Sequence, residues 1–431
     1  MATVRFGVAV RDITPDFPVM LHGYASRDRP STRVSEPIQA AALCLEGRGE
    51  GGDGNARLVV LALDMIGVDA AAVEMLRADL ARECGLGRGE LLVAASHTHF
   101  APCISPQLFA TLGVVEPDPG YVALVRRAVV DVVRHSCAEL RQGEFQEYRA
   151  SVPSVLFNRR MTMRASGAAR KVETNYLYPS DDSPFELSPV DSGLTVLRIV
   201  AEGAPRAAIA NFGCHPVTGG RDGAGSGNDV SADYPWYLRE VVGRAWGCPV
   251  LFTLGAAGDA VPIQRAGLSR ERIGATLGNS IVLGERVLSA AHGAAGEAVV
   301  THRAARMEAA TILRTRETPA GEKDPAAAVL RAFRSRLYPD DRFAIEVAIH
   351  RIGDTVLVAF PFEVLSEVAL TLKRYRAGVV VVSVANGYQG YLPQAHEYGR
   401  GGYEATPEST HFEPGTMDRL LDLVREELDR I

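Results

Sequence analysis

Short apolar runs alternate along this chain with segments in which apolar residues recur every three or four positions. The runs have the length of β-strands, and they cover residues 58–65, 90–95, 194–200, 207–212, 249–254, 355–359 and 379–384. The helical spacing predicts helices at residues 70–83, 121–140, 234–246, 270–292, 363–375 and 416–430. Strands with near-continuous Val, Leu and Ile are typically buried on both faces. We therefore predict an α/β fold in which mixed β-sheets are layered with helices.

Glycine-rich and charged segments separate these elements. Residues 46–55 predict an exposed, flexible loop between two strands, and residues 201–205 predict a hairpin turn. Residues 218–228 form a second glycine-rich segment, which either borders a substrate or is a surface loop without a role. Residues 315–324 are a polar connection, and they mark a soft boundary between a larger N-terminal part and a C-terminal part.

The composition is that of an ordinary globular protein. The chain has 431 residues, 47% hydrophobic and 23% charged, and its length alone suggests two or three domains. A net charge of −6 with dispersed acids and bases argues against binding to nucleic acid or to an anionic membrane. No apolar run reaches the roughly 18 residues that span a bilayer. The N-terminus lacks a signal-peptide pattern and the six cysteines lack CxxC spacing, so we expect free thiols and a cytoplasmic location.

Residues 91–99 (LLVAASHTH) join an apolar run to two histidines, His97 and His99. Side chains two positions apart leave the same face of an extended strand, so we expect the two imidazoles to point the same way. Neutral imidazole is the commonest metal ligand. The motif is weak by itself, because either ring could instead be a core histidine bound to a backbone carbonyl.

Other chemically capable residues follow strong strands in the same manner. They are His215 after 207–212, Asp259 after 251–258, Glu363 after 356–362, and Asn386, Tyr388 and Tyr391 after 379–384. Sites in parallel sheets collect beyond the carboxyl ends of the strands. The repeated placement predicts a single pocket.

Each of these residues also has a simpler interpretation. His215 precedes a proline and could only shape a turn, and Glu363 could cap a helix that starts near residue 362. Tyr391 and Tyr403 could be packing residues. The remaining histidines have no partner at ligand spacing, and we interpret them as surface or structural, with His22 and His396 the least settled of them.

Taken together, a series of motifs resembles the neutral ceramidase family, the zinc-dependent N-acylsphingosine amidohydrolases. In order, the motifs are RDITP at 11–15, MLHGY at 20–24, SHTH at 96–99 with Pro102, NR at 158–159, NFGCHP at 211–216, GDAVP at 258–262, FPFE at 360–363, NGYQGY at 386–391, EY at 397–398 and YEA at 403–405. The likeness spans most of the chain. It implies one catalytic domain over residues 1–431, without the immunoglobulin-like C-terminal domain of the family.

The resemblance also implies a zinc site. Its ligands would be His97, His215, Glu363 and Tyr391, a donor set that suits a borderline-soft divalent ion and leaves a position for water. The residues that line the reaction centre would be His99, Arg159 and Tyr403. Residues 160–163 (RMTM) depart from the family's continuation, so Arg160 is a rival for Arg159.

These residues imply a zinc-dependent amidohydrolase that cleaves an amide bond with metal-activated water. No HExxH motif supplies a glutamate base, and His99 is therefore the expected proton acceptor. The expected partner is a small N-acyl compound, either ceramide-like or smaller and more soluble. Two alternatives stay open, namely a metal-dependent esterase and a noncatalytic protein that binds a metal or ligand. The sequence indicates no oligomeric state.

Overall fold

A large mixed β-sheet organises the molecule. The computed structural model describes residues 2–52, 54–164, 170–218, 227–263, 268–284, 296–311, 332–338 and 340–431. In these residues thirteen strands form one sheet. Its main path is β16 (Val250–Leu254), β14 (Ala204–Phe212), β13 (Gly193–Ala201), β8 (Arg141–Ser151), β1 (Ala2–Asp12), β3 (Gln39–Gly49), β19 (Val299–Ala310), β20 (Arg342–Ile352), β21 (Thr355–Ala359) and β22 (Val379–Val382). Off this path, β4 (Asn55–Leu63) pairs with β3 and with β5 (Leu91–Ala95), and β18 (Gly296–Glu297) pairs with β1.

The register of the strands explains the continuous apolar runs. In β4, Leu58 and Val60 belong to one core cluster, whereas Val59 and Leu61 belong to another. Side chains alternate between the two faces of a strand, so both faces of the sheet are buried. Parallel pairs such as β4 with β5 and antiparallel pairs such as β3 with β4 occur together, and the prediction of a mixed α/β fold is confirmed.

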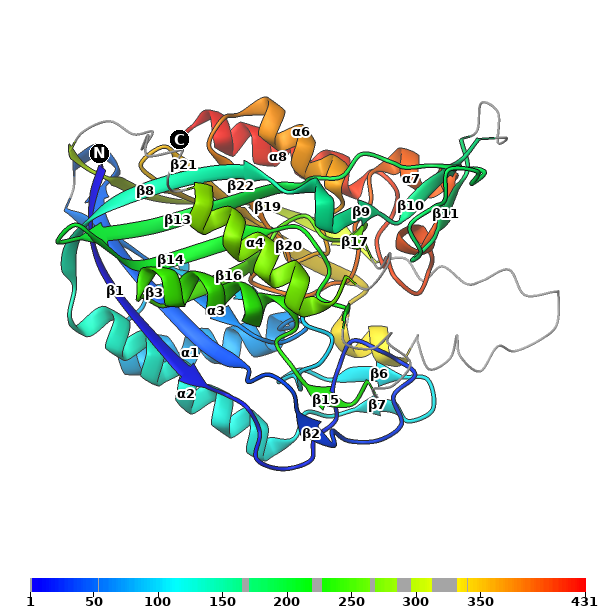
Figure 1. Cartoon of the computed structure of the whole chain (residues 1–431), viewed down its shortest axis with the longest axis horizontal. Helices are drawn as coiled ribbons and strands as arrows, with labels where there is room; N and C mark the ends of the chain where they lie inside the picture. The colour runs from blue at the N-terminus through cyan, green and yellow to red at the C-terminus, as the bar shows by residue number, and fades with distance from the viewer. Residues whose placement is uncertain are drawn as a thin grey trace.

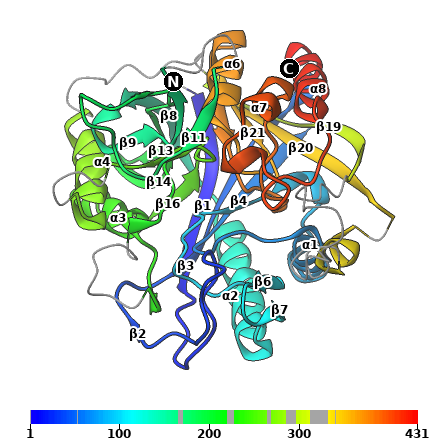
Figure 2. The same cartoon turned by 90° about the vertical axis from the view of Figure 1, so that its right-hand side faces the viewer.

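Helices cover the outer faces of the sheet (Figures 1 and 2). On one side the core includes residues of α1 (Ala70–Cys84), α2 (Pro119–Ala138), α3 (Tyr234–Trp246) and α4 (Arg270–Gly284). On the other side it includes residues of α6 (Ser366–Tyr375) and α8 (Thr416–Asp429). Between them lies a cluster to which β3, β4, β5, β21 and β22 all contribute. The two halves of the sheet therefore pack against each other, and the layers run helix, sheet, sheet, helix.

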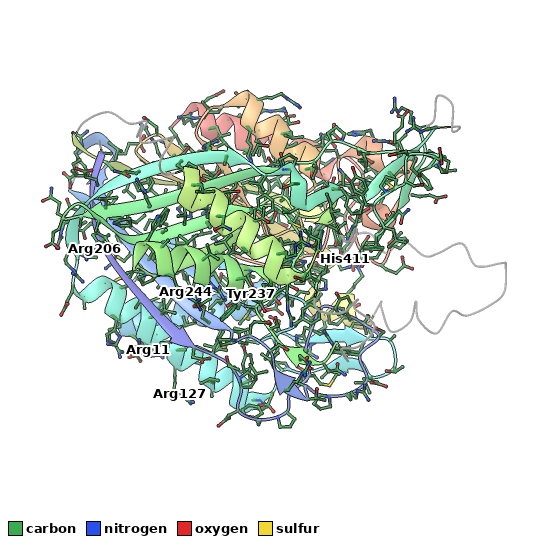
Figure 3. All side chains as sticks on the ribbon, in the orientation of Figure 1. Arg11, Arg127, Arg206, Tyr237, Arg244 and His411 are labelled. Carbon is green, nitrogen blue, oxygen red and sulfur yellow. The ribbon has the colours of Figure 1, made fainter. Side chains whose placement is uncertain are left out.

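Small accessory elements gather at one end of the molecule, to the right in Figure 1. They are the strand pairs β2 (Arg33–Val34) with β15 (Asp229–Val230), β6 (Gln107–Phe109) with β7 (Gly113–Val115) and β9 (Leu156–Asn158) with β17 (Ala260–Pro262), the sheet of β10 (Arg160–Met163), β11 (Val172–Thr174) and β12 (Phe185–Glu186), and helix α7 (Ala395–Arg400). The β13–β14 hairpin lies at the opposite end, as the labels Arg206 and His411 in Figure 3 mark. β14 therefore runs toward the accessory elements.

Several predicted elements need correction. The loop predicted at residues 46–55 is wrong for much of its length, because β3 and β4 continue as a ladder from Glu46↔Arg57 to Arg48↔Asn55. The hairpin turn is confirmed, with positive φ at Glu202 and Gly203 as tight hairpins require. The helix predicted from residue 363 begins at Ser366.

Some predictions fall partly or wholly outside the described residues. These are the connection at 315–324, the middle of the glycine-rich segment at 219–226 and the end of the helix predicted to reach residue 292. Among the described helices, none has the length and apolar character that crossing a membrane requires.

Candidate metal centre

His97 and His99 lie just beyond the end of β5. The segment after β5 is hydrogen-bonded to the end of β4 and to the residues that follow it. The Ser96 and His97 amides donate to the Leu63 and Met65 carbonyls, each at 2.9 Å. His97 then adopts a φ of 65°, so the predicted extended conformation is wrong. The two rings nevertheless converge, with centroids 5.0 Å apart. The left-handed residue, rather than the period of a strand, brings them together.

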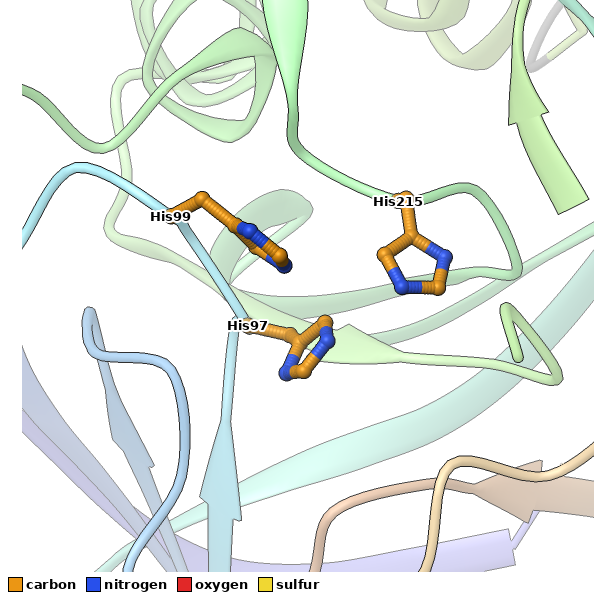
Figure 4. A group of neighbouring side chains, drawn as sticks. All are labelled: His97, His99 and His215. Carbon is orange, nitrogen blue, oxygen red and sulfur yellow. The ribbon is translucent and has the colours of Figure 1, made fainter. Parts of the chain in front are cut away.

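His215 completes a group of three imidazoles (Figure 4). It follows β14, and its ring centroid is 5.0 Å from that of His97 and 5.7 Å from that of His99. One ring nitrogen from each histidine lies within 4.8 Å of the others. The predicted convergence of the two histidine segments in one place is therefore present in the structure.

Backbone carbonyls fix the tautomers of two of these rings. Nδ1 of His97 lies 2.6 Å from the Ile66 carbonyl oxygen, and Nδ1 of His215 faces the Ala257 carbonyl. A carbonyl oxygen only accepts, so each Nδ1 carries the proton. The two Nε2 lone pairs are then turned into the site, which is the arrangement that metal-binding histidines use.

Glu363 places a carboxylate oxygen between these lone pairs. Its Oε2 lies 3.0 Å from Nε2 of His215 and 3.2 Å from Nε2 of His97.

The interpretation of Glu363 as a helix cap is wrong, because α6 begins three residues later. There Asp259 accepts from the Ser366 amide at 2.8 Å and from its hydroxyl at 2.7 Å. Burial raises the pKa of Asp259 to about 6.

Tyr391 stands at the other side of His215. Its hydroxyl oxygen is 3.5 Å from Nε2 of His215, and it accepts a hydrogen bond of 2.9 Å from Nη2 of Arg159. A parallel bridge between Glu363 and Tyr391 holds the two segments together. Burial raises the pKa of Tyr391, whereas the guanidinium of Arg159 opposes that shift and favours the phenolate.

The buried donor set requires a cation. With Nδ1 protonated, both Nε2 atoms and the carboxylate oxygen are acceptors, and acceptors do not approach to about 3 Å unless a positive charge lies among them. A proton on one imidazole would meet this need, and burial of the Glu363 carboxyl is outweighed by its contacts with the two imidazoles, which lower its pKa. A divalent ion meets it as well.

The donor separations are those expected around a zinc-sized ion. Ligand bonds of about 2.0–2.1 Å give ligand-to-ligand separations of about 3.3–3.4 Å at tetrahedral angles, and a fifth position for water spreads these separations to about 2.9–3.6 Å. The three separations among His97, His215, Glu363 and Tyr391 given above are 3.0, 3.2 and 3.5 Å. Burial lowers the pKa of His215, which keeps this imidazole neutral and able to bind a metal. These residues therefore form a candidate metal centre.

His99 is the third imidazole, and neither of its buried ring nitrogens has a hydrogen-bond partner among the described residues. Gly23 packs against the ring so closely that a Cβ there would lie 2.6 Å from it, and Nη2 of Arg27 donates to the His99 carbonyl at 2.8 Å. Burial, with the neighbouring imidazoles, lowers the pKa of His99 well below its usual value. The ring is thus neutral, and its lone pair is available to a ligand ion or to a proton.

The rival arginines occupy different positions. Arg159 lines the cavity beside Tyr391, whereas Arg160 lines a different cavity and pairs with Glu404 at 2.7 Å and with Glu397. Glu404 is fully buried and also accepts from Nε of Arg159 at 2.7 Å. Burial would lower the pKa of Arg159, but the partners Tyr391 and Glu404 outweigh it and raise that pKa.

An open cavity of about 390 Å³ leads to this group. Tyr403 lies at its exposed part, with 42% of its surface accessible, and burial of the hydroxyl end raises its pKa to about 12. The guanidinium of Arg159 lies 5.3 Å from the ring centroid of Tyr176 and 5.6 Å from that of Tyr403. His99, His215 and Glu363 line the same cavity, so the predicted single pocket contains most of the predicted site.

Two members of the site were not assigned a role from sequence. Glu404 follows Tyr403 within the YEA motif, and Tyr388 donates to Oε1 of Glu363 at 2.8 Å. Both lie inside motifs that the sequence displays, but their partners are distant in the chain. Two other residues predicted to follow strands, Asn386 and Asp259, accept hydrogen bonds from backbone amides. Asn386 Oδ1 accepts from the Val93 amide at 2.9 Å, and Asp259 accepts from the Ser366 amide as described above.

A second group of potential ligands lies at the junction of α6 and α7, with His396 and Glu367 exposed and Glu397 buried. Nε2 of His396 is 3.0 Å from a carboxylate oxygen of Glu367 and 3.2 Å from one of Glu397. Both oxygens of Glu397 also pair with arginines, Arg400 and Arg160. His396 thus has carboxylate partners, although no partner at ligand spacing was predicted from the sequence.

The layered α/β fold and the buried histidine–carboxylate group define a protein with a candidate metal centre at one end of its sheet. Among solved structures, the chain is similar to the neutral ceramidase from Pseudomonas aeruginosa, with a TM-score of 0.73 at 19% identity, over 99% of this chain and 75% of that one. It is equally similar to a ceramidase complexed with C2, with a TM-score of 0.73 at 18% identity, over 100% of this chain and 76% of that one. No protein-family model and no curated protein matches the sequence. The resemblance predicted from the motifs is confirmed at the level of the fold.

Proposed function

We propose that this protein is a zinc-dependent hydrolase that cleaves the amide bond of an N-acyl compound. The observation that carries the proposal is the convergence of the two Nε2 lone pairs of His97 and His215 on the Glu363 carboxylate in a buried pocket. Tyr391 would be the fourth ligand. When bound, zinc polarises a carbonyl oxygen and lowers the pKa of a bound water toward neutrality.

His99 is the residue that would move the proton. Its neutral ring lies beside the donor set, and both ring nitrogens are without a protein partner among the described residues. In amide hydrolysis, a bond forms between water oxygen and the acyl carbon, the C–N bond breaks, and the amine nitrogen gains a proton. His99 would accept the proton from water and return it to that nitrogen.

Arg159 and Tyr403 would stabilise the oxyanion of the tetrahedral intermediate. Both line the cavity, and Arg159 is held by Glu404 and by the Gly258 carbonyl, to which its Nη2 donates at 2.9 Å. A donor fixed in this way needs little reorganisation during the reaction. The names of the similar structures, a neutral ceramidase and a ceramidase complexed with C2, support an N-acyl amine as the substrate class.

Metal analysis and a substrate panel together test the proposal. The purified protein should contain one transition-metal ion per chain and should hydrolyse N-acyl amines, and a chelator should abolish this activity until zinc is returned. The panel pairs each amide with its matched ester. Turnover of esters alone would replace the amidase by an esterase, and a protein without stoichiometric metal would favour a noncatalytic role.

A further inference from the structure

The two oxygens of the Glu363 carboxylate have different partners. Oε2 faces the imidazoles of His97 and His215, whereas Oε1 accepts a hydrogen bond of 2.8 Å from the hydroxyl of Tyr388. The described residues place no lysine or arginine side chain on this carboxylate. The phenol is therefore its main hydrogen-bond donor on the side away from the imidazoles.

Tyr388 is itself held firmly. Its ring lies against Gly67, where a Cβ would approach the ring to 2.6 Å, and it makes an edge contact with His97 at a centroid distance of 5.7 Å. The segment that carries Tyr388 is fixed to β5 two residues earlier, because the Asn386 amide donates to the Val93 carbonyl at 2.8 Å. The hydroxyl thus reaches Glu363 from a rigid support.

We propose that Tyr388 is a positioning residue for the metal centre, which holds Oε1 of Glu363 so that Oε2 alone is presented to the ion. This inference rests on the proposed function. A carboxylate without such a donor can rotate and offer both oxygens, and groups that orient metal ligands in this way typically contribute about 10–100-fold to metal affinity. The proposal also separates two tyrosines of the NGYQGY motif: Tyr388 orients a ligand, and Tyr391 is one.

The Tyr388→Phe variant tests the proposal, because it keeps the ring in its contact with Gly67 and removes only the hydroxyl. Tyr148→Phe is the matched control: that phenol donates to the Ser280 carbonyl at 2.6 Å between β8 and α4, away from the site. Zinc affinity is measured by competition with a chromophoric chelator, and the thermal midpoint of the metal-free protein is measured alongside. We expect about 10–100-fold weaker zinc binding for Tyr388→Phe and no change for Tyr148→Phe.

The outcomes separate this inference from the proposed function. A wild-type protein that binds no zinc refutes the metal centre as a whole. A wild-type protein that binds zinc, with a Tyr388→Phe variant of equal affinity, refutes only the role of Tyr388. A structure of the zinc-loaded wild-type protein gives a test that needs no variant: both carboxylate oxygens at bonding distance from the ion would contradict the proposal.

Discussion

Among the described residues, histidine and glutamate side chains meet twice, once in the buried group of His97, His215 and Glu363 and once around the exposed His396. The nitrogen–oxygen distances are the same in both groups, 3.0 and 3.2 Å. What differs is the surrounding charge. At the surface one imidazole lies between two carboxylates, and arginines already neutralise Glu397. In the buried group, two proton-free nitrogens surround one carboxylate oxygen.

Ligand geometry alone therefore does not identify a metal site. An exposed imidazole between two carboxylates is satisfied by its own proton and by water, and such surface pairs contribute little. A buried set of acceptors is unfavourable until a cation joins it. We therefore expect metal binding to depend on the buried group and not on the group around His396.

The largest effect is expected from His97→Ala and His215→Ala. Each removes one proposed ligand of the buried group, so zinc content and hydrolysis should be lost together, as measured by metal analysis and the amide assay. His396→Ala is the matched control in the exposed group. It should leave zinc content unchanged and alter the free energy of unfolding by no more than about 0.5 kcal/mol. Loss of metal from His396→Ala would instead place the metal at the group around His396 and contradict its assignment to the buried group.

His99→Ala should separate metal binding from catalysis. Zinc content should stay at one ion per chain, while kcat should fall about 10²–10⁴-fold because the proposed proton acceptor is gone. Metal analysis and steady-state kinetics on one preparation measure both quantities. If zinc is lost instead, His99 is a ligand, and the buried group is a three-histidine centre.

Tyr403→Phe should lower kcat about 10²–10³-fold through the loss of one donor to the oxyanion. Zinc content should not change, because Tyr403 lies at the open part of the cavity. A KM that rises with no change in kcat would show that Tyr403 binds substrate and does not stabilise the transition state.

Tyr391→Phe should have the smallest effect on the metal among the proposed ligands, since its hydroxyl has the longest separation from a neighbouring donor, 3.5 Å. We expect zinc affinity to fall by at least about tenfold, or about 1.4 kcal/mol, in chelator competition. An unchanged affinity would remove the phenol from the ligand set.

Several strands buried on both faces were predictable, although β3, whose two faces also lie in two core clusters, was not among the predicted strands. The runs in β4, β5, β21 and β22 have an unbroken apolar character, and the structure confirms them within two or three residues. Strands β8 and β20 were not predicted, because charged residues interrupt them where one face meets solvent. A strand with one exposed face shows alternation, which short polar interruptions conceal.

The candidate site was predictable in its residues and less so in its geometry. The order of motifs indicated His97, His215, Glu363 and Tyr391, and the structure brings these four together. The positive φ of His97 has no sequence signal, since left-handed backbone is uncommon outside glycine. The contact of Glu404 with Arg159 joins residues 245 positions apart, and only the tertiary fold reveals such a pair.

An anomalous-scattering crystal structure of the purified protein, with data collected on both sides of the zinc edge, tests the central claim most directly. The account predicts one zinc peak bonded to Nε2 of His97, Nε2 of His215 and a single oxygen of Glu363, with the Tyr391 hydroxyl as the fourth protein donor. Ordered imidazoles around Glu363 with no metal peak among them, in protein prepared with zinc present, would contradict it.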